Sequence, residues 1–261
     1  MPPRARALAL ALTALLMPAA GCSADDGPRR AGDRVTAQEA RVLAGLLHSN
    51  AELGGADFVV TAPYAEAVLT LTGTIDFEES VGRAEAVTTF PDERTDDVRT
   101  VFFTADDLWT GDLPALEAAL DAADAGNATY LRRPLAAGDD EPEGDQPEDG
   151  PLLIDVLARI LLGLAAPSAD DPQAFLDGEY TWQGQQSIDG RLAWVFGLPI
   201  GTVAVGAGDD LLMQYAAPLA GEAVDVTVTL TRHGRRGVDL PSDKETESVA
   251  DHPEIAEDLG I

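Results

Sequence analysis

The stretch that decides the fold is residues 69–78, with the sequence LTLTGTIDFE. From Leu69 to Phe77, apolar residues or glycine alternate with threonine and aspartate. This period of two is typical of a strand with one buried face. The alternation resumes in residues 84–90 after a short turn, so the sequence predicts an antiparallel hairpin here.

Other runs extend the predicted sheet in both directions along the chain. Residues 224–231, VDVTVTLT, alternate over their whole length. Residues 180–188 and 191–197 flank an Asp-Gly pair, which is a strong turn signal, and predict a second hairpin. Residues 98–103 predict a further strand. The sequence therefore indicates a sheet that is largely antiparallel.

Helices are expected between these strands, which makes the fold class α+β. Residues 36–39, TAQE, match a capping box, and leucines at helical spacing follow up to Gly54. Residues 113–125 are rich in Ala and Leu and predict a second helix.

A third helix, over residues 151–164, is apolar around most of its circumference. From Pro151 to the closing Pro167 it has about 16 residues and two charges, so it is too short and too polar to span a bilayer. It must therefore be covered by the sheet or by an apolar ligand. Asp155 and Arg159 stand one turn apart and are expected to pair with each other.

The N-terminus, residues 1–21, resembles a bacterial lipoprotein signal peptide. Arg4 and Arg6 precede an uncharged Ala/Leu-rich stretch, and residues 19–22, AAGC, resemble a lipobox. In proteins with this signal the cysteine is acylated, with groups such as palmitate. Cys22 is therefore the expected lipid anchor, on the outer face of the cytoplasmic membrane after export. A plain signal peptide, with an incidental Cys22, is the alternative.

The expected organisation after the signal has four parts. Residues 22–34 comprise the acylated cysteine and a flexible tether, residues 35–245 the folded domain, and residues 246–261 an acidic, frayed tail. Within the domain, residues 138–150 contain seven acids and no basic residue, which predicts an exposed loop. A calcium site in this loop is the sharper alternative, although the spacing of an EF-hand is absent.

The composition excludes several classes of function. The formal net charge is −29, so the chain repels phosphate backbones and nucleic-acid binding is not expected. The chain contains one cysteine, which excludes an intramolecular disulfide and a cysteine-based metal cluster.

Catalytic patterns are also lacking in the sequence. His48, His233 and His252 are not spaced as metal ligands usually are, and we expect all three at the solvated surface. A Gly-x-Ser-x-Gly elbow is absent. The prediction is therefore a protein that is not an enzyme and has no catalytic residue, metal or cofactor. An active site assembled from distant strands is the alternative.

The order of these elements resembles the LppX/LprA/LprF/LprG family of actinobacterial lipoproteins. The resemblance lies in Cys22 with its lipobox, in LTLTGTID at residues 69–76, and in VDVTVTLTRHGRRGVDLP at residues 224–241. Residues 106–177 depart from the family pattern. The resemblance implies a LolA-like antiparallel half-barrel that is covered on its concave side by helices and binds lipid.

Two interpretations of the apolar strand faces stay open at this stage. They can line a cavity for a lipid or glycolipid, which the protein carries or presents within the cell envelope, or they can form a filled core. With a filled core, the protein would act through an envelope protein partner. The resemblance favours the cavity, and the residues expected to line it are Leu69, Leu71, Ile75, Phe77, Leu192, Trp194, Phe196, Val226 and Val228.

Overall fold

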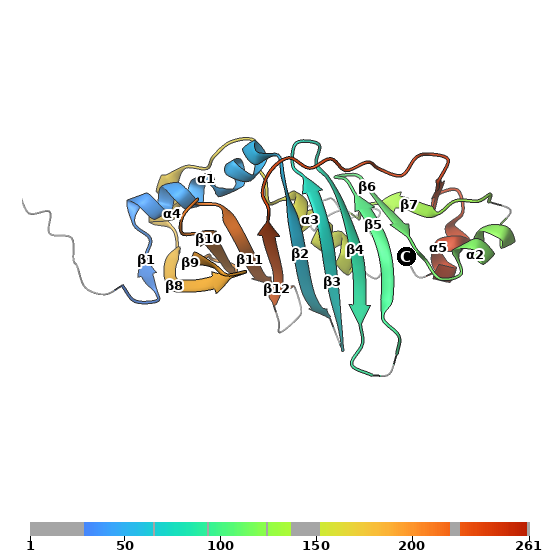
Figure 1. Cartoon of the computed structure of the whole chain (residues 1–261), viewed down its shortest axis with the longest axis horizontal. Coiled ribbons are helices and arrows are strands. Elements are labelled where there is room, and N and C mark those ends of the chain that lie inside the picture. Colours follow the sequence, from blue (N-terminus) through green and yellow to red (C-terminus); the bar gives the residue numbers. More distant parts are fainter. Residues whose placement is uncertain are drawn as a thin grey trace, which may run out of the picture.

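The computed structural model describes residues 29–64, 66–92, 94–123, 125–136, 152–219 and 225–259. The signal peptide, Cys22 and the acidic loop of residues 138–150 lie outside these ranges. The described residues form a single open sheet with helices along it (Figure 1). Its strands are β1 (Asp33–Arg34), β2 (Gly55–Tyr64), β3 (Ala67–Asp76), β4 (Val81–Thr89), β5 (Asp97–Phe103), β6 (Asp107–Gly111), β7 (Tyr130–Pro134), β8 (Thr181–Ile188), β9 (Arg191–Gly197), β10 (Thr202–Gly206), β11 (Leu212–Pro218), β12 (Asp225–Thr231) and β13 (Thr246–Ser248).

Two antiparallel meanders make up this sheet. Strands β2 to β7 pair in sequence order, and so do β8 to β12. The pair β12·β2 joins the meanders, with Val228 opposite Val60. Strand β1 pairs with β8 at one edge, and β13 runs parallel to β7 at the other. The expected α+β fold with an open, mainly antiparallel sheet is therefore confirmed.

The alternation in residues 69–77 gives β3 one buried face. Leu71 lies opposite Val60 of β2 and Ala86 of β4, and all three side chains are buried. The neighbouring residue Thr72 points to the other face and is exposed. One face of the sheet centre is thus apolar and covered, whereas the other carries threonines.

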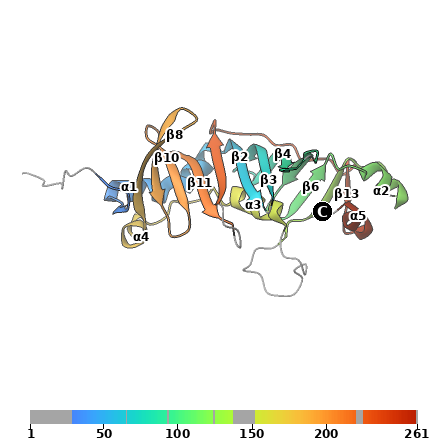
Figure 2. The ribbon, with the colours of Figure 1, turned by 90° about the horizontal axis from the view of Figure 1, so that it is seen from below.

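Helices α1 and α3 contribute to the same core as this buried face. The helices are α1 (Ala37–Leu53), α2 (Leu116–Ala122), α3 (Leu153–Leu162), α4 (Pro172–Asp177) and α5 (Pro253–Leu259). Figure 2 shows α3 beside β2 and β3, and α1 and α4 toward the β8–β11 half. None of the helices in the described ranges combines the length and apolarity that a membrane crossing requires.

The predicted capping box starts α1. The Thr36 side chain accepts a hydrogen bond from the Glu39 amide, and the Glu39 carboxylate accepts one from the Thr36 amide at 2.8 Å. Gly54 ends the helix in a left-handed conformation with φ of 83°.

The C-terminal segment differs from the frayed tail that we expected. Residues 246–248 form β13, and α5 packs against α2 in a small separate cluster. The reason is that Ile255 and Val249 bring apolar side chains to Leu116 and Leu120. The end of the expected tether also differs, because Asp33 and Arg34 pair with β8.

Candidate functional site

A cavity of about 380 Å³ lies between three helical segments and the inner face of β10 and β11. Its volume falls within the range of small-molecule sites, roughly 300–1,000 Å³. Asp170 is the one charged residue among the described residues that line it. The full lining is Leu43, Leu46, Leu47, Ile160, Gly163, Leu164, Asp170, Phe175, Tyr180, Leu198, Val203, Leu212 and Tyr215.

The helical wall of the cavity is held together by hydrogen bonds between distant segments. The amides of Ala166 and Asp170 donate to the α1 carbonyls of Leu47 and Ala44, at 3.0 and 2.9 Å. The Asn50 side-chain amide donates to the Leu164 carbonyl at 2.7 Å. The segment that follows α3 is therefore fixed to the second half of α1.

The sheet wall is formed by neighbouring positions on β10 and β11. Val203 and Tyr215 lie opposite each other in the register, and Leu212 lies next to a β-bulge. The turn after β9 closes with a hydrogen bond from the Leu198 amide to the Gly201 carbonyl at 2.9 Å. Gly201 has φ of 93°, and a Cβ there would clash with the Ala216 carbonyl, so this turn requires glycine.

Three of the residues that line the cavity have polar side-chain groups, namely Asp170, Tyr180 and Tyr215. Asp170 is exposed, and the half-buried Tyr180 ring packs against Phe175 at a tilt of 43°, with 4.6 Å between ring centroids. Burial raises the pKa of Tyr215, so its hydroxyl keeps its proton well above neutral pH. The lining fits an apolar chain, with a polar group near the exposed Asp170.

A buried ion pair positions α3. The Arg133 guanidinium on β7 contacts both oxygens of Asp155, at 2.8 and 3.0 Å, and the Asp155 side chain is 1% exposed. Arg159 does not pair with Asp155, contrary to the expectation from their spacing. It donates instead to the carbonyls of Ala136 and Leu135, at 2.6 and 3.3 Å. Arg159 makes these contacts because the residues directly after β7 lie beside α3.

None of the nine residues expected to line a cavity lines this one, although all nine lie in the described part of the chain. Five of them are buried in the packed core beneath the helices, so the expected cavity at the sheet centre is filled. Helix α3 contributes Leu157 and Leu161, both at full burial, to the same core as these residues. The five buried residues are Leu71, Ile75, Phe196, Val226 and Val228.

The other four lie at the margins of this core. Leu69 and Trp194 are half-buried and pack against it. Phe77 lines a second hollow of about 290 Å³ with Glu78 and Ser80 at the turn after β3. Leu192 is 52% exposed because it lies close to the β8–β9 turn, at the end of its strand.

The sequence interpretation missed most of the actual lining. The one signal for it was the adjacent pair Leu46 and Leu47, which makes the apolar stripe of α1 wider than a single face needs. Phe175 lies on α4, a six-residue helix that was not predicted, and Leu198 lies in a turn.

All three histidines are half-buried, whereas we expected them at the solvated surface. His48 contacts the Ala166 carbonyl and His252 contacts the Glu254 carboxylate, each at 3.4 Å. His233 lies against the backbone of Leu212, and burial lowers its pKa. Within the described ranges, no group of three or more His, Cys, Asp or Glu side chains is placed to hold a metal ion.

Comparison with known proteins finds matches among solved structures. No protein-family model matches the chain, and no curated protein matches it in sequence. Among solved structures, the chain is similar to LprF from Mycobacterium bovis, with a TM-score of 0.43 and 13% identity over 79% of this chain and 97% of that one. It is also similar to an uncharacterized conserved protein from Thermus thermophilus, with a TM-score of 0.38 and 11% identity over 81% and 98% of the two chains. LprF is a member of the family that the sequence resembles.

Proposed function

We propose that the chain is a membrane-anchored lipoprotein that holds an acyl chain of a lipid or glycolipid in the cavity and carries or presents it within the cell envelope. The observation that carries this proposal is the lining, which is apolar except for Asp170 and the hydroxyl groups of two tyrosines. An apolar cavity stays dry and binds apolar molecules, since water would find no hydrogen-bond partners there.

The size of the cavity supports one chain rather than several. At roughly 30 Å³ for each water-sized group, a volume of about 380 Å³ holds about a dozen such groups. The headgroup would then stay near Asp170 and the hydroxyl groups of Tyr180 and Tyr215. The anchor in this proposal is the acylated Cys22, for which the lipobox is the support.

The test is extraction of the purified chain followed by mass spectrometry. The chain freed from its anchor by Cys22→Ala should release a bound lipid. Leu47→Trp should remove most of that lipid, because the half-buried Leu47 side chain lines the cavity and the indole would occupy its space. Its free energy of unfolding should stay within about 1 kcal/mol of the parent, since the space is not already filled.

The matched control is Leu192→Trp, the same substitution at an exposed position outside the cavity. It should keep both the lipid and the stability of the parent. A parent that releases no lipid, together with a Leu47→Trp chain that is plainly destabilised, would contradict the proposal. That result would favour an interaction protein with a filled core and an envelope protein partner.

A further inference from the structure

The N-terminal segment is fixed to the same end of the molecule as the cavity. The Gly32 amide donates to the Trp182 carbonyl at 2.8 Å, and the Val35 amide donates to the Tyr180 carbonyl at 3.4 Å. Tyr180 itself lines the cavity. The chain therefore enters the domain beside the cavity wall.

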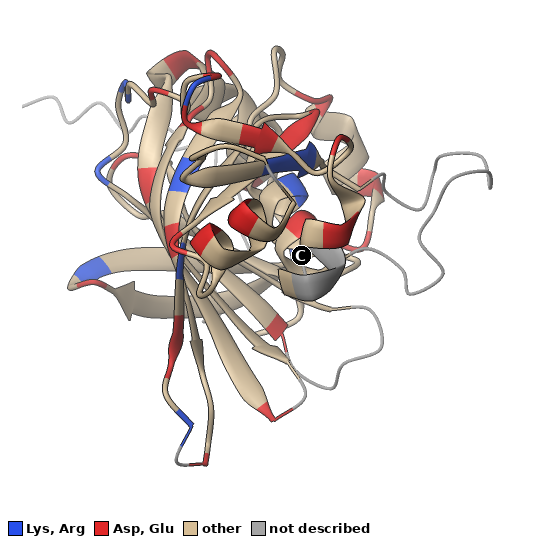
Figure 3. Cartoon of the chain, turned by 90° about the vertical axis from the view of Figure 1, so that its right-hand side faces the viewer, with Lys and Arg blue, Asp and Glu red and all other residues tan. Residues whose placement is uncertain are grey.

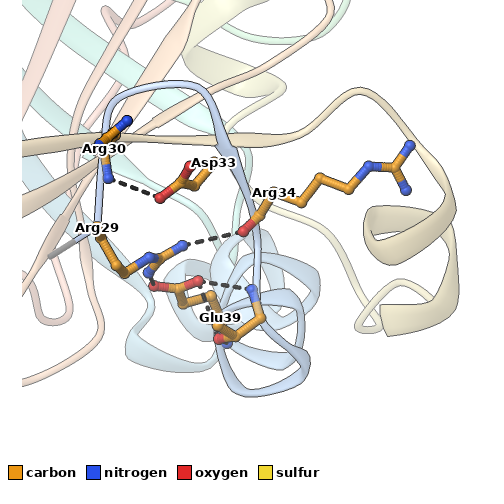
Figure 4. Close-up of polar contacts among 6 residues, drawn as sticks. Arg29, Arg30, Asp33, Arg34 and Glu39 are labelled. Carbon is orange, nitrogen blue, oxygen red and sulfur yellow. Dashed lines mark hydrogen bonds and ion pairs between the residues drawn. The ribbon is translucent and has the colours of Figure 1, made fainter. Parts of the chain in front are cut away.

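This fixed segment begins at Arg29 (Figure 4). The Arg29 guanidinium forms an ion pair with Glu39 on α1 and donates to the Arg34 carbonyl at 3.1 Å. It also lies over the Trp182 ring, 4.7 Å from the centroid. Because the Glu39 carboxylate also caps α1, one side chain holds both the incoming chain and the first turn of the helix.

The sequence leaves a short connection between this point and the expected anchor. Residues 23–28 separate Cys22 from Arg29. Whatever their conformation, seven Cα–Cα steps span at most about 25 Å. An acylated cysteine lies at the bilayer surface, so the cavity end is held near the membrane.

The far end of the elongated molecule is acidic (Figures 1 and 3). It carries α2 and α5, and exposes the carboxylates of Glu117, Asp121 and Glu254. An anionic bilayer repels such a surface.

An exposed apolar tip lies next to the cavity. Ile200 is 67% exposed in the turn between β9 and β10, two residues after Leu198, which lines the cavity. Residues 198–202, LPIGT, carry no charge. The other hairpin tips that the structure describes all carry at least one acid, as Glu78 does after β3 and Asp209 after β10. This uncharged apolar tip lies beside the cavity in a chain whose net charge is −29.

We propose that residues 198–202 insert into the surface of the bilayer that holds the acylated Cys22, so that the cavity opens at the lipid surface. This inference rests on the anchor and the ligand of the proposed function. The bilayer supplies the apolar environment for Ile200, and the acyl chain enters the cavity along Leu198. The short connection keeps the tip at a high effective concentration near the bilayer.

The test uses the acylated full chain in vesicles of phosphatidylethanolamine and phosphatidylglycerol. Ile200→Cys gives a single free thiol, because the chain has one native cysteine and acylation consumes it. An environment-sensitive fluorophore on this thiol should show blue-shifted emission that brominated lipid quenches. A flexible Gly/Ser insertion between Pro28 and Arg29 should weaken both effects.

Leu240→Cys is the matched control, since Leu240 is 40% exposed and lies in the segment between β12 and β13. A fluorophore at position 240 should show the emission of a water-exposed label, without quenching by brominated lipid. The inference is overturned if the label at position 200 also reports water, or if both positions respond equally.

Lipid extraction from the purified Cys22→Ala chain, which is kept free of vesicles, separates the two proposals. If lipid binds while the label at position 200 stays in water, the docking inference fails and the cavity function stands. If the label inserts and no lipid binds, the cavity function fails and the docking stands.

Discussion

The strands at the centre of the sheet and the strands that line the cavity belong to one sheet. The two regions differ in the helices that cover them. At the centre, α3 contributes Leu157 and Leu161 at full burial, and the strand faces beneath it are packed. At the cavity end, the neighbouring cover is α4, whose six described residues include none that is buried. Phe175 and Leu176 of this short helix pack against the core but are only half-buried, and space remains between α1 and the strands. The covering helix, and not the strand pattern, decides between core and cavity.

The largest effect on the free energy of unfolding is expected from a substitution in the packed region. Asp155→Asn leaves the Arg133 guanidinium in a buried site without its anionic partner. Breaking such a pair costs about 3–5 kcal/mol, so the free energy of unfolding in urea should fall by that amount.

The control for this experiment is Asp209→Asn, which breaks the exposed ion pair with Arg191. Exposed pairs contribute about 0–1 kcal/mol. Equal losses from both substitutions would show that α3 is not held over the centre by its ion pair.

A matched pair of truncations compares the two regions directly. Leu71→Ala removes a side chain that is 1% exposed at the packed centre and should cost about 2–5 kcal/mol. Leu47→Ala removes the same atoms from a half-buried position on the cavity wall, and should cost about 1 kcal/mol or less because fewer contacts are lost. Urea denaturation of the two chains measures the difference. If Leu47→Ala costs as much as Leu71→Ala, the cavity end is packed as well.

The smallest expected effect concerns pH. Burial lowers the pKa of His233 in the folded chain, whereas the unfolded value is about 6.5. As the pH falls below that value, the unfolded chain takes up the proton first. The stability that the neutral ring provides is therefore complete above about pH 6.5 and is lost as the pH falls toward the folded pKa.

His233→Gln should flatten this part of the stability profile between roughly pH 7 and pH 5, the range in which histidine titrates. The other two histidines remain in both chains, so the difference between the profiles isolates His233. Parallel profiles for the two chains would mean that the ring next to Leu212 is solvated.

The sequence predicted much of the sheet and the orientation of its strands. Leu71, Ile75, Val226 and Val228 all point to the covered face, as their period of two indicated. Strand β2, whose sequence contains Asp57 and Pro63, was missed. Periodicity shows which face is buried, but it carries no information on what fills the space opposite.

The cavity could not be predicted for the same reason. Its lining includes residues of α1, of α3 and its C-terminal end, of α4, of a turn and of two strands, which the chain brings together only in three dimensions. Likewise, the spacing of Asp155 and Arg159 showed that they could meet, but not that Arg133 of β7 would lie closer to Asp155.

The pairing of β12 with β2 has a consequence for how the chain folds. Val60 and Val228, which lie opposite each other there, are 168 positions apart in the sequence. Each meander is built from neighbouring hairpins and can form early, whereas this junction requires closure of a very long loop. The two halves of the sheet can therefore join only after nearly the whole chain has been made. Until then, the apolar edges of β2 and β12 are open to other partners, and this is the stage at which the protein is most exposed to aggregation.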